Sequence, residues 1–391
     1  MYMFNRKLII TACTFLCAGM LSAQSVDVKV GDESIKITPV GRMYLDGAVF
    51  MEDETSLDNG VTMSDLRLGL KAKYKSWEVK LDIGYANSKV SAKDIFVQYN
   101  LNKSSYVRGG NFIEPFGLDH MESSSNTTFI SPNGSSNVFA PSRKIGLEYI
   151  GWSKLFWYGG GVFADNGAIK NEQDRGDDGY SGAGRFVFTP FEESGKILHI
   201  GLAGALRKAD ASGKDEEGSA KYLRKFKFAS NILNTKDTRT AIGTTINNAD
   251  FQAKYAVELI AAYGPLYLQG EYFHSNTKRR AGLPTYKADG AYAQIGFLAI
   301  GGNYGYSSSW SRMATPRPGS LEFAVRYNYT NLDGNEFSKG GTMSDITLGA
   351  NYFLNKYMAI KLNYSYMSLG QNAALANENI SVFSVRYQVV F

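Results

Sequence analysis

The last twelve residues of the chain, 380–391, read ISVFSVRYQVVF. Counting back from the end, every second residue is apolar or aromatic, namely Phe391, Val389, Tyr387, Val385 and Phe383. The residues between them are mixed and partly polar. Strict alternation with a period of two predicts a β-strand with one dry face and one wet face. The stretch therefore predicts a terminal strand that separates two different environments.

The same alternation recurs along most of the chain. Residues 66–74 and 77–85 both alternate, and only two residues separate them, which predicts a hairpin. Tyr and Trp cluster at the ends of such stretches, as in the aromatic girdles of lipid-facing strands. The pattern indicates a transmembrane β-barrel closed by the terminal strand, because in lipid every backbone N–H and C=O must be paired. The alternative is a soluble β-protein, whose aromatic residues would gather in one core.

Loop lengths alternate as well. The turn at 354–357 is tight, whereas the connections at 331–342 and 368–379 are long, as is typical of membrane barrels. We predict an all-β fold: a single transmembrane antiparallel β-barrel of about 16 strands, with short periplasmic turns and long extracellular loops. The predicted strands are 36–50, 62–75, 77–87, 90–101, 106–113, 143–153, 155–165, 180–190, 195–207, 250–263, 265–277, 288–303, 320–331, 343–354, 356–368 and 380–391. Residues 26–37 form either a small hairpin outside the wall or two more strands, which would make eighteen.

Composition supports this fold class. The 391 residues include 25 Tyr, 23 Phe and 41 Gly but only 9 Pro, which favours an all-β chain. Beyond the N-terminus there is no run of about 18 apolar residues, which excludes a helical membrane protein.

The N-terminus is predicted to be a targeting segment. Arg6 and Lys7 precede an apolar core at residues 8–21, and the small residues before Gln24 suit cleavage after Ala23. Without the two basic residues the net charge falls from +5 to +3, which is too small to indicate a nucleic-acid partner. Both cysteines lie in this segment, so the mature chain has no disulfide framework. The predicted domains are a cleaved signal peptide (1–23), a short periplasmic N-terminal segment (24–35) and the barrel (36–391).

Four stretches of the chain carry a family resemblance. They are VRGGNFIEPFGLD at 107–119, AYGPLYLQGEYF at 262–273, EFAVRYNYTNLD at 322–333 and GGTMSDITLGANYFLN at 340–355. These stretches resemble the phosphate-selective porin O/P family, and the resemblance covers most of the mature chain. It implies a homotrimeric, sixteen-stranded porin in the outer membrane of a Gram-negative bacterium, in contact with lipid and lipopolysaccharide, with a third loop folded inward.

A barrel of this size encloses an aqueous channel, which the inward faces of the strands would line. The predicted pore-lining residues are Arg42, Arg67, Lys71, Lys73, Lys80, Arg185, Arg326, Lys361, Arg386, Asp46, Asp82 and Glu322. The same faces also carry Arg207, Lys254, Asp65, Glu78, Asp94, Glu148, Glu258, Glu271 and Asp345. Basic and acidic residues nearly balance. They either segregate into walls that set up a transverse field or simply wet and brace the lumen.

The third loop is the predicted constriction. Its candidate residues are Glu114, Pro115, Phe116, Asp119, His120, Glu122 and, at its end, Arg143. Between Ile113 and Arg143 it has no Lys or Arg, whereas the resemblance implies lysines there in anion-selective members. The fifth loop carries Lys221, Arg224, Lys225 and Lys227. If this loop folds into the mouth it would attract anions; if it stays in solvent it is an ordinary charged loop.

These features predict a porin for passive diffusion of small hydrophilic solutes or ions, with at most weak anion or phosphate preference and no cofactor or metal. The alternative is a non-conducting outer-membrane barrel that acts as an adhesin or a structural protein. An enzyme would need a nucleophile and a base. Only His120, His199 and His274 are available as a base, and no flanking motif supports any of them, so we predict no enzymatic activity.

Overall fold

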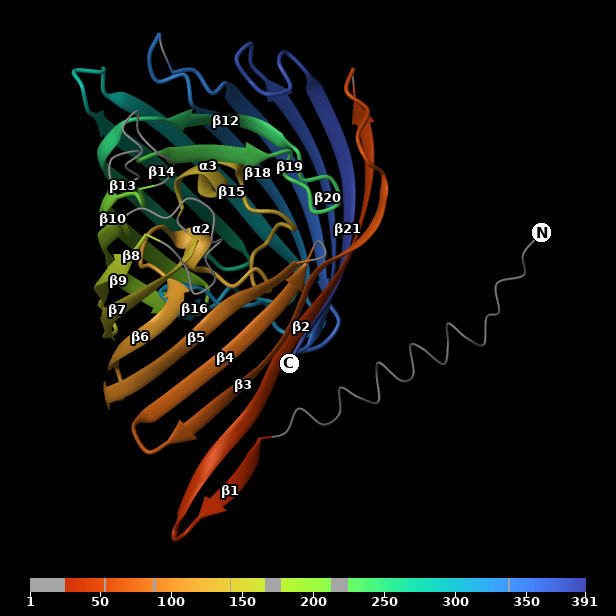
Figure 1. Ribbon diagram of the computed structural model, residues 1–391. Coiled ribbons are helices and arrows are strands. Elements are labelled where there is room, and N and C mark those ends of the chain that lie inside the picture. Colours follow the sequence, from red (N-terminus) through yellow and green to blue (C-terminus); the bar gives the residue numbers. More distant parts are fainter. Residues whose placement is uncertain are drawn as a thin grey trace.

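The computed structural model describes residues 25–52, 54–86, 89–140, 142–165, 177–211, 224–336 and 338–391. The predicted signal peptide lies outside these ranges, as does Lys221 of the predicted mouth loop. The main sheet has seventeen strands, and all but β1 form the wall of a barrel (Figure 1). The wall strands are β2 (Glu33–Glu52), β3 (Gly60–Tyr74), β4 (Trp77–Ala86), β5 (Lys89–Asn102), β6 (Ser105–Ile113), β7 (Arg143–Trp152), β8 (Phe156–Ala164), β9 (Tyr180–Glu193), β10 (Lys196–Lys208), β13 (Ala249–Tyr263), β14 (Leu266–Arg279), β15 (Tyr286–Ile300), β18 (Leu321–Asn331), β19 (Thr342–Phe353), β20 (Met358–Leu369) and β21 (Asn379–Val390).

The wall is a closed antiparallel ring of sixteen strands. Each strand pairs with its neighbours in chain order, and the ring closes where β2 pairs with both β3 and β21. Along the closing seam Arg42 lies opposite Val390, and the backbone groups of Phe391 and Gly41 exchange two hydrogen bonds of 2.9 Å. The terminal strand is therefore the closing strand, as predicted, and its backbone groups are paired on both sides.

Residues 26–37 do not enlarge the ring. Strand β1 (Val26–Val30) pairs with residues 33–37 of β2, which extends beyond the wall at the end where the chain terminates (Figure 1). An ion pair of 2.5 Å joins Glu33 to Lys75 in the first tight turn. The open question between a hairpin and two more wall strands is settled in favour of a hairpin.

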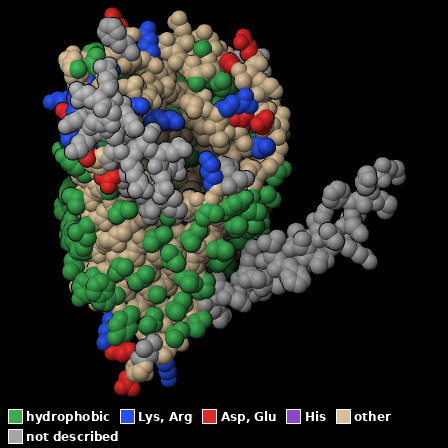
Figure 2. Space-filling view, in the orientation of Figure 1, with side chains coloured by type: hydrophobic (Ala, Val, Ile, Leu, Met, Phe, Trp, Pro, Cys, Tyr) green, Lys and Arg blue, Asp and Glu red, His purple; other side chains and the backbone are tan. Residues whose placement is uncertain are grey.

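The outer face of the wall is apolar. Leu81, Ile360 and Val385 are 44%, 37% and 38% exposed, although each lies in the middle of a strand. Apolar side chains cover the outer wall, whereas charged side chains gather at its two ends (Figure 2). A continuous apolar band of this kind is suited to hydrocarbon and would be unfavourable in water.

The third loop (residues 114–142) lies inside the barrel. It carries two short helices, α2 (Leu118–Met121) and α3 (Gly134–Phe139), and no helix of the described chain is long and apolar enough to cross a membrane. The backbone N–H groups of Leu118 and Asp119 donate to Glu271 at 2.5 and 2.9 Å, and that of Ile130 donates to Asn363 at 2.7 Å. The loop therefore packs against the wall from β14 to β20, and its predicted inward fold is confirmed.

The fifth loop crosses the mouth over its described residues 224–248. Its strands β11 (Phe226–Asn231) and β12 (Thr240–Ile246) form a hairpin over the barrel opening (Figure 1). At its tip, Thr235 donates to Asp46 at 2.7 Å and Asn234 to Ser384 at 3.0 Å, both on the opposite wall. Of the two alternatives for this loop, the structure has the one in which it folds into the mouth.

The connection from β15 to β18 also enters the barrel, from the end that otherwise has short turns. This inner segment (residues 301–320) contains β16 (Tyr306–Ser307) and β17 (Arg312–Met313). Tyr304 and Met313 are buried against the wall, and the hydroxyl of Tyr304 donates to Glu322 at 2.7 Å. No element was predicted for residues 304–319. Tyr304 and Met313 are the buried anchors of this segment, whereas its Trp310 is 57% exposed.

The three inward elements fill one side of the lumen. On that side Arg185, Arg326 and Lys361 are at most 3% exposed. On the other side Arg67 and Lys80 of β3 and β4 keep 13% and 24% of their side-chain surface. The accessible part of the lumen therefore lies along β2 to β5.

Candidate functional site

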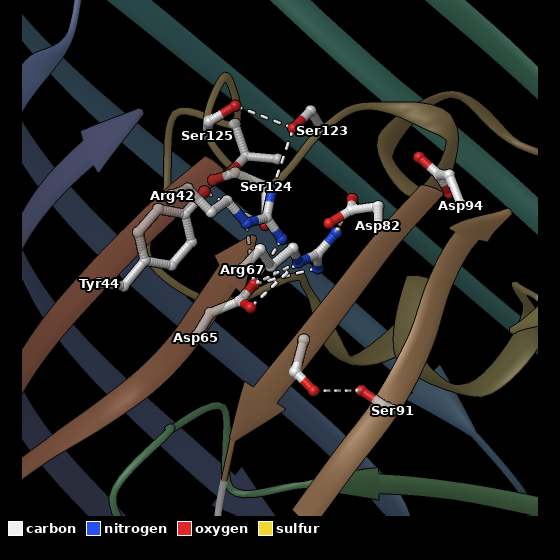
Figure 3. Close-up of polar contacts among 12 residues, drawn as sticks. Arg42, Tyr44, Asp65, Arg67, Asp82, Ser91, Asp94, Ser123, Ser124 and Ser125 are labelled. Atoms are coloured by element: carbon white, nitrogen blue, oxygen red, sulfur yellow. Dashed lines mark hydrogen bonds and ion pairs between the residues drawn. The ribbon is translucent and has the colours of Figure 1, made fainter. Parts of the chain in front are cut away.

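Polar side chains gather on the accessible side of the lumen, where the third loop faces the wall (Figure 3). We call this group the wall cluster. It consists of five basic residues and three carboxylates, namely Arg42, Arg67, Lys80, Lys93, Arg143, Asp65, Asp82 and Asp94. The alternation of β2, β3 and β4 places Arg42, Asp65, Arg67, Lys80 and Asp82 inward, opposite the apolar outer face. Lys93 and Asp94 come from a bulge in β5, and Arg143 begins β7.

One half of the wall cluster centres on Asp65. Arg42 Nε donates to its Oδ2 at 2.9 Å, and Arg67 Nη2 lies 3.0 Å from the same oxygen. Arg67 also lies 3.9 Å from Asp82. On the opposite side, Arg42 Nη1 donates to Ser123 of the third loop at 3.2 Å (Figure 3). The two arginines therefore stand between the carboxylates of the wall and the hydroxyl groups of the third loop.

The other half centres on Asp94. Lys80 and Arg143 lie 2.8 and 2.7 Å from its two carboxylate oxygens. Lys93 extends over Gly84, where a Cβ would come within 2.3 Å of the lysine Cε. The glycine thus makes room for a fifth cation in the cluster.

A second polar site lies nearer the mouth, between the third loop, the fifth loop and the wall. It is a cavity of about 280 Å³, here called the basic cavity, which is lined by Lys144, Arg207, Lys227 and Lys254 together with Asn137, Ser142, Gln252 and Ser275. Two carboxylates lie beside it: Glu114 is 3.3 Å from Lys144, and Asp165 is 3.4 Å from the same nitrogen. Within the described ranges, Lys227 has no carboxylate partner. Lys144 follows Arg143 directly, so the two sites adjoin.

The predicted acidic constriction residues are directed into packed structure rather than toward the wall cluster. Burial raises the pKa of Glu114, but Lys254 and Lys144 outweigh it, so the pKa lies below its ordinary value. Asp119 is buried and accepts from Asn133 at 3.1 Å, and burial raises its pKa. Burial also raises the pKa of Glu122, to about 7, although Arg312 lies 3.0 Å away.

The remaining candidates of the third and fifth loops are scattered. Pro115 and Phe116 are buried, and His120 is half-buried. Arg224 is buried and donates to the carbonyl of Ala209, whereas Lys225 is exposed. Of the predicted mouth-loop cations that the structure describes, Lys227 lines the basic cavity.

Several predicted pore-lining residues lie on the inward face but are buried by the loops. Arg386 pairs with Asp46 at 2.6 Å, and Arg185 pairs with Glu258 at 2.8 Å. Arg326 donates to the carbonyl of Ser131, Lys361 donates to that of Thr127, and Glu322 accepts from Tyr304. Arg326 and Lys361 thus hold the third loop against the wall, Arg185 and Glu322 hold the inner segment, and Arg386 joins β21 to β2.

Two predicted pore-lining residues lie nearer the short-turn end. Lys71 and Lys73 both pair with Glu78, at 2.6 and 3.1 Å. With 33% and 54% of their side-chain surface exposed, they are more accessible than the wall cluster.

Three inward cations of the described wall strands were not among the predicted residues. Lys144 lies four residues before Glu148 in β7, so the two share a face of the strand. Because Glu148 was predicted to face inward, strand alternation also predicts an inward Lys144. Arg108 is buried and lies 2.5 Å from Glu148, and alternation in β6 would have placed it inward too. Lys93 lies in a β-bulge of β5 opposite Asp82, where the alternation shifts, so a count of alternate residues does not predict its direction.

The histidines do not form an obvious catalytic group. His199 is buried between Tyr306 and Glu258, at 2.8 and 3.1 Å. His274 lies 2.6 Å from Asp289, which also accepts from Tyr272 at 2.6 Å. Across the described part of the chain, no group of three or more His, Cys, Asp or Glu is arranged to hold a metal ion.

Comparisons with known proteins agree with this architecture. The model of the family "Phosphate-selective porin O and P" matches residues 40–391. Porin O of Pseudomonas aeruginosa is 23% identical over 358 residues, which cover 81% of this chain and 79% of that protein.

Solved structures resemble the chain in fold. The anion-selective porin from Comamonas acidovorans has a TM-score of 0.59 at 14% identity, covering 91% of this chain and 100% of that one. OmpT of Vibrio cholerae in its trimer form has a TM-score of 0.57 at 11% identity, covering 91% and 99%. The first of these structures is of a porin and the second is of an outer-membrane protein.

Proposed function

Because the chain belongs to the phosphate-selective porin O and P family, we propose that its pore carries small hydrophilic solutes and ions with a weak preference for anions. The protein is a porin of the Gram-negative outer membrane and gives passive diffusion. The proposal concerns which solutes it favours and which residues they meet.

The observation that carries the proposal is the charge of the two polar sites. The wall cluster has five basic residues against three carboxylates, and the basic cavity has four against two. Charged side chains beside a narrow, low-dielectric passage raise the local concentration of ions of the opposite sign. Glu114 is one of the two carboxylates counted here, and the other acidic side chains of the third loop, Asp119 and Glu122, do not offset the remaining excess, because both are buried.

The two sites define a path for solutes. In the proposed path an anion passes the fifth loop, meets Lys227 in the basic cavity, and then moves along the wall cluster past Lys80 and Arg67, beside the contact between Arg42 and Ser123. Lys71 and Lys73 lie beyond, toward the periplasm. Most of these cations also have a carboxylate nearby, so they attract anions without binding them tightly, which a diffusion channel requires.

We expect the purified protein in planar bilayers to show a chloride permeability roughly two to three times that of potassium, because both sites have a modest cationic excess. The measurement is the reversal potential in a tenfold KCl gradient, with both ions able to pass. A reversal potential with the sign expected for a cation-selective channel would contradict the proposal. Saturation of the current at low phosphate concentration would point instead to a selective phosphate site.

We also propose that the protein is a homotrimer, which the trimer form of the similar Vibrio cholerae outer-membrane protein supports. Protein extracted in mild detergent and loaded unheated is expected to run on a gel as a trimer that boiling converts to a monomer. The same sample crosslinked at low concentration provides the control. A single monomer band under both unheated and crosslinked conditions would contradict the proposal.

A further inference from the structure

Two inward elements that enter the barrel from opposite ends meet inside it. Arg312 of the inner segment lies 3.0 Å from Glu122 of the third loop. Next to this ion pair, the amide of Asn126 bridges Arg312 and Thr315. With its oxygen turned to the guanidinium it accepts from Nη1 and Nη2 at 2.5 and 2.6 Å, and its nitrogen lies 3.0 Å from the threonine hydroxyl.

The inner segment is itself fixed to the wall. The indole N–H of Trp157 donates to the carbonyl of Ser309 at 3.2 Å, and Arg185 donates to the carbonyl of Ser311 at 3.1 Å. Ser308 donates to Glu192 at 2.5 Å, and the hydroxyl of Tyr306 lies 2.8 Å from His199. With contacts to β8, β9 and β10, the segment is a firm support for whatever it holds.

The held part of the third loop borders the proposed path. Glu122 is followed directly by Ser123, which accepts from Arg42 of the wall cluster and lies 2.8 Å from Ser125. Glu122 thus faces the inner segment, and its neighbour faces the opposite wall. A shift of the loop at Glu122 would change the distance between Ser123 and the wall cluster.

We propose that Arg312 is a positioning residue that clamps the third loop from the periplasmic side and so sets the width of the pore at the wall cluster. This inference rests on the path proposed above, in which solutes pass the wall cluster beside the contact between Ser123 and Arg42. Arg312 does not need to touch the solute to act. It acts through Glu122 and Asn126.

The ion pair should make the clamp sensitive to pH. Burial raises the pKa of Glu122 to about 7, and the charged groups that face it are Arg312 of the inner segment, Asp119 of its own loop and Lys361 of β20. Below pH 7 the carboxyl group is docked in its neutral form and depends little on Arg312. Above pH 7 it is docked as an anion and needs the guanidinium. Removing Arg312 should therefore matter more at high pH than at low pH.

The test is the single-channel conductance of R312Q in planar bilayers, measured from pH 5 to 9. At pH 9 we expect a conductance about 1.5 to 2 times that of the wild type, with added noise, because conductance grows with the open cross-section and the freed loop moves away from the wall. At pH 5 the difference should be small. The charge-swapped variant R312E/E122R should bring the conductance back toward the wild-type value.

The matched control is R317Q, which removes an exposed arginine from the same segment without a contact to the third loop. It should behave as the wild type at every pH. If R312Q does not insert as a heat-modifiable trimer, T315A is measured instead. This variant removes only the hydrogen bond between Thr315 and Asn126, and it should raise the conductance less than R312Q would. Wild-type conductance in R312Q or T315A across the pH range would overturn the clamp, whereas cation selectivity in the wild type would overturn only the proposed function.

Discussion

Replacing Arg386 with methionine is expected to lower the free energy of unfolding by about 3–5 kcal/mol, the usual cost of leaving one partner of a buried ion pair alone. Arg386 Nε and Nη2 donate to the two carboxylate oxygens of Asp46 at 2.7 and 2.6 Å, and both side chains are at most 3% exposed. The two residues are opposite each other in the pairing of β2 with β21. The substitution would leave a buried carboxylate at the seam of the barrel.

Equilibrium unfolding in urea, in detergent micelles or small vesicles, measures this loss. The double variant D46N/R386M should lose less than R386M alone, because no charge then remains buried. The matched control is R280M, which breaks an exposed pair with Asp250 and should change the stability by no more than about 1 kcal/mol. Equal stabilities for R386M and R280M would show that the seam does not depend on this pair.

The double variant R67E/K227E is expected to abolish the anion preference. R67E leaves the wall cluster with four cations and four carboxylates, and K227E leaves the basic cavity with three of each. Without an excess of either sign, the ratio of chloride to potassium permeability should fall to about one. The reversal potential in a KCl gradient should then lie near zero.

The control is K154E/K225E, which changes the charge by the same amount at positions outside both sites. Lys154 lies in an exposed turn, and Lys225 is exposed beside β11. This variant should keep the wild-type reversal potential. A shift as large as that of R67E/K227E would mean that the overall charge, and not these two sites, determines the preference.

Strand alternation was a strong guide to the wall and a weak guide to the lumen. It predicted all sixteen wall strands, because an apolar outer face and a polar inner face leave a period of two in the sequence. Val385 belongs to the dry face predicted for the terminal strand, and it is exposed on the outer wall together with Leu81 and Ile360. The bulge beside Asp82 shifts this pattern, and Lys93 was missed for that reason.

The loops could not be placed in the same way. Glu114 and Glu122 look alike in the sequence as acidic residues of a predicted constriction, yet their partners are Lys254 and Arg312, far along the chain. Such pairs depend on which part of the wall each loop packs against. The alternation of residues within a strand carries no information about that packing. The inner segment had a signal in its aromatic residues and its length, but nothing in it indicates the direction in which it turns.

The seam between β2 and β21 has a consequence for biogenesis. Arg386 and Asp46 are 340 residues apart in sequence, so the ring can close only after every intervening strand has formed. Until then two strand edges with unpaired N–H and C=O groups remain, and such edges invite aggregation in water and are excluded from lipid. We therefore expect the unfolded chain to depend on a periplasmic chaperone. We also expect it to depend on an insertion machinery that covers both strand edges until β21 pairs with β2.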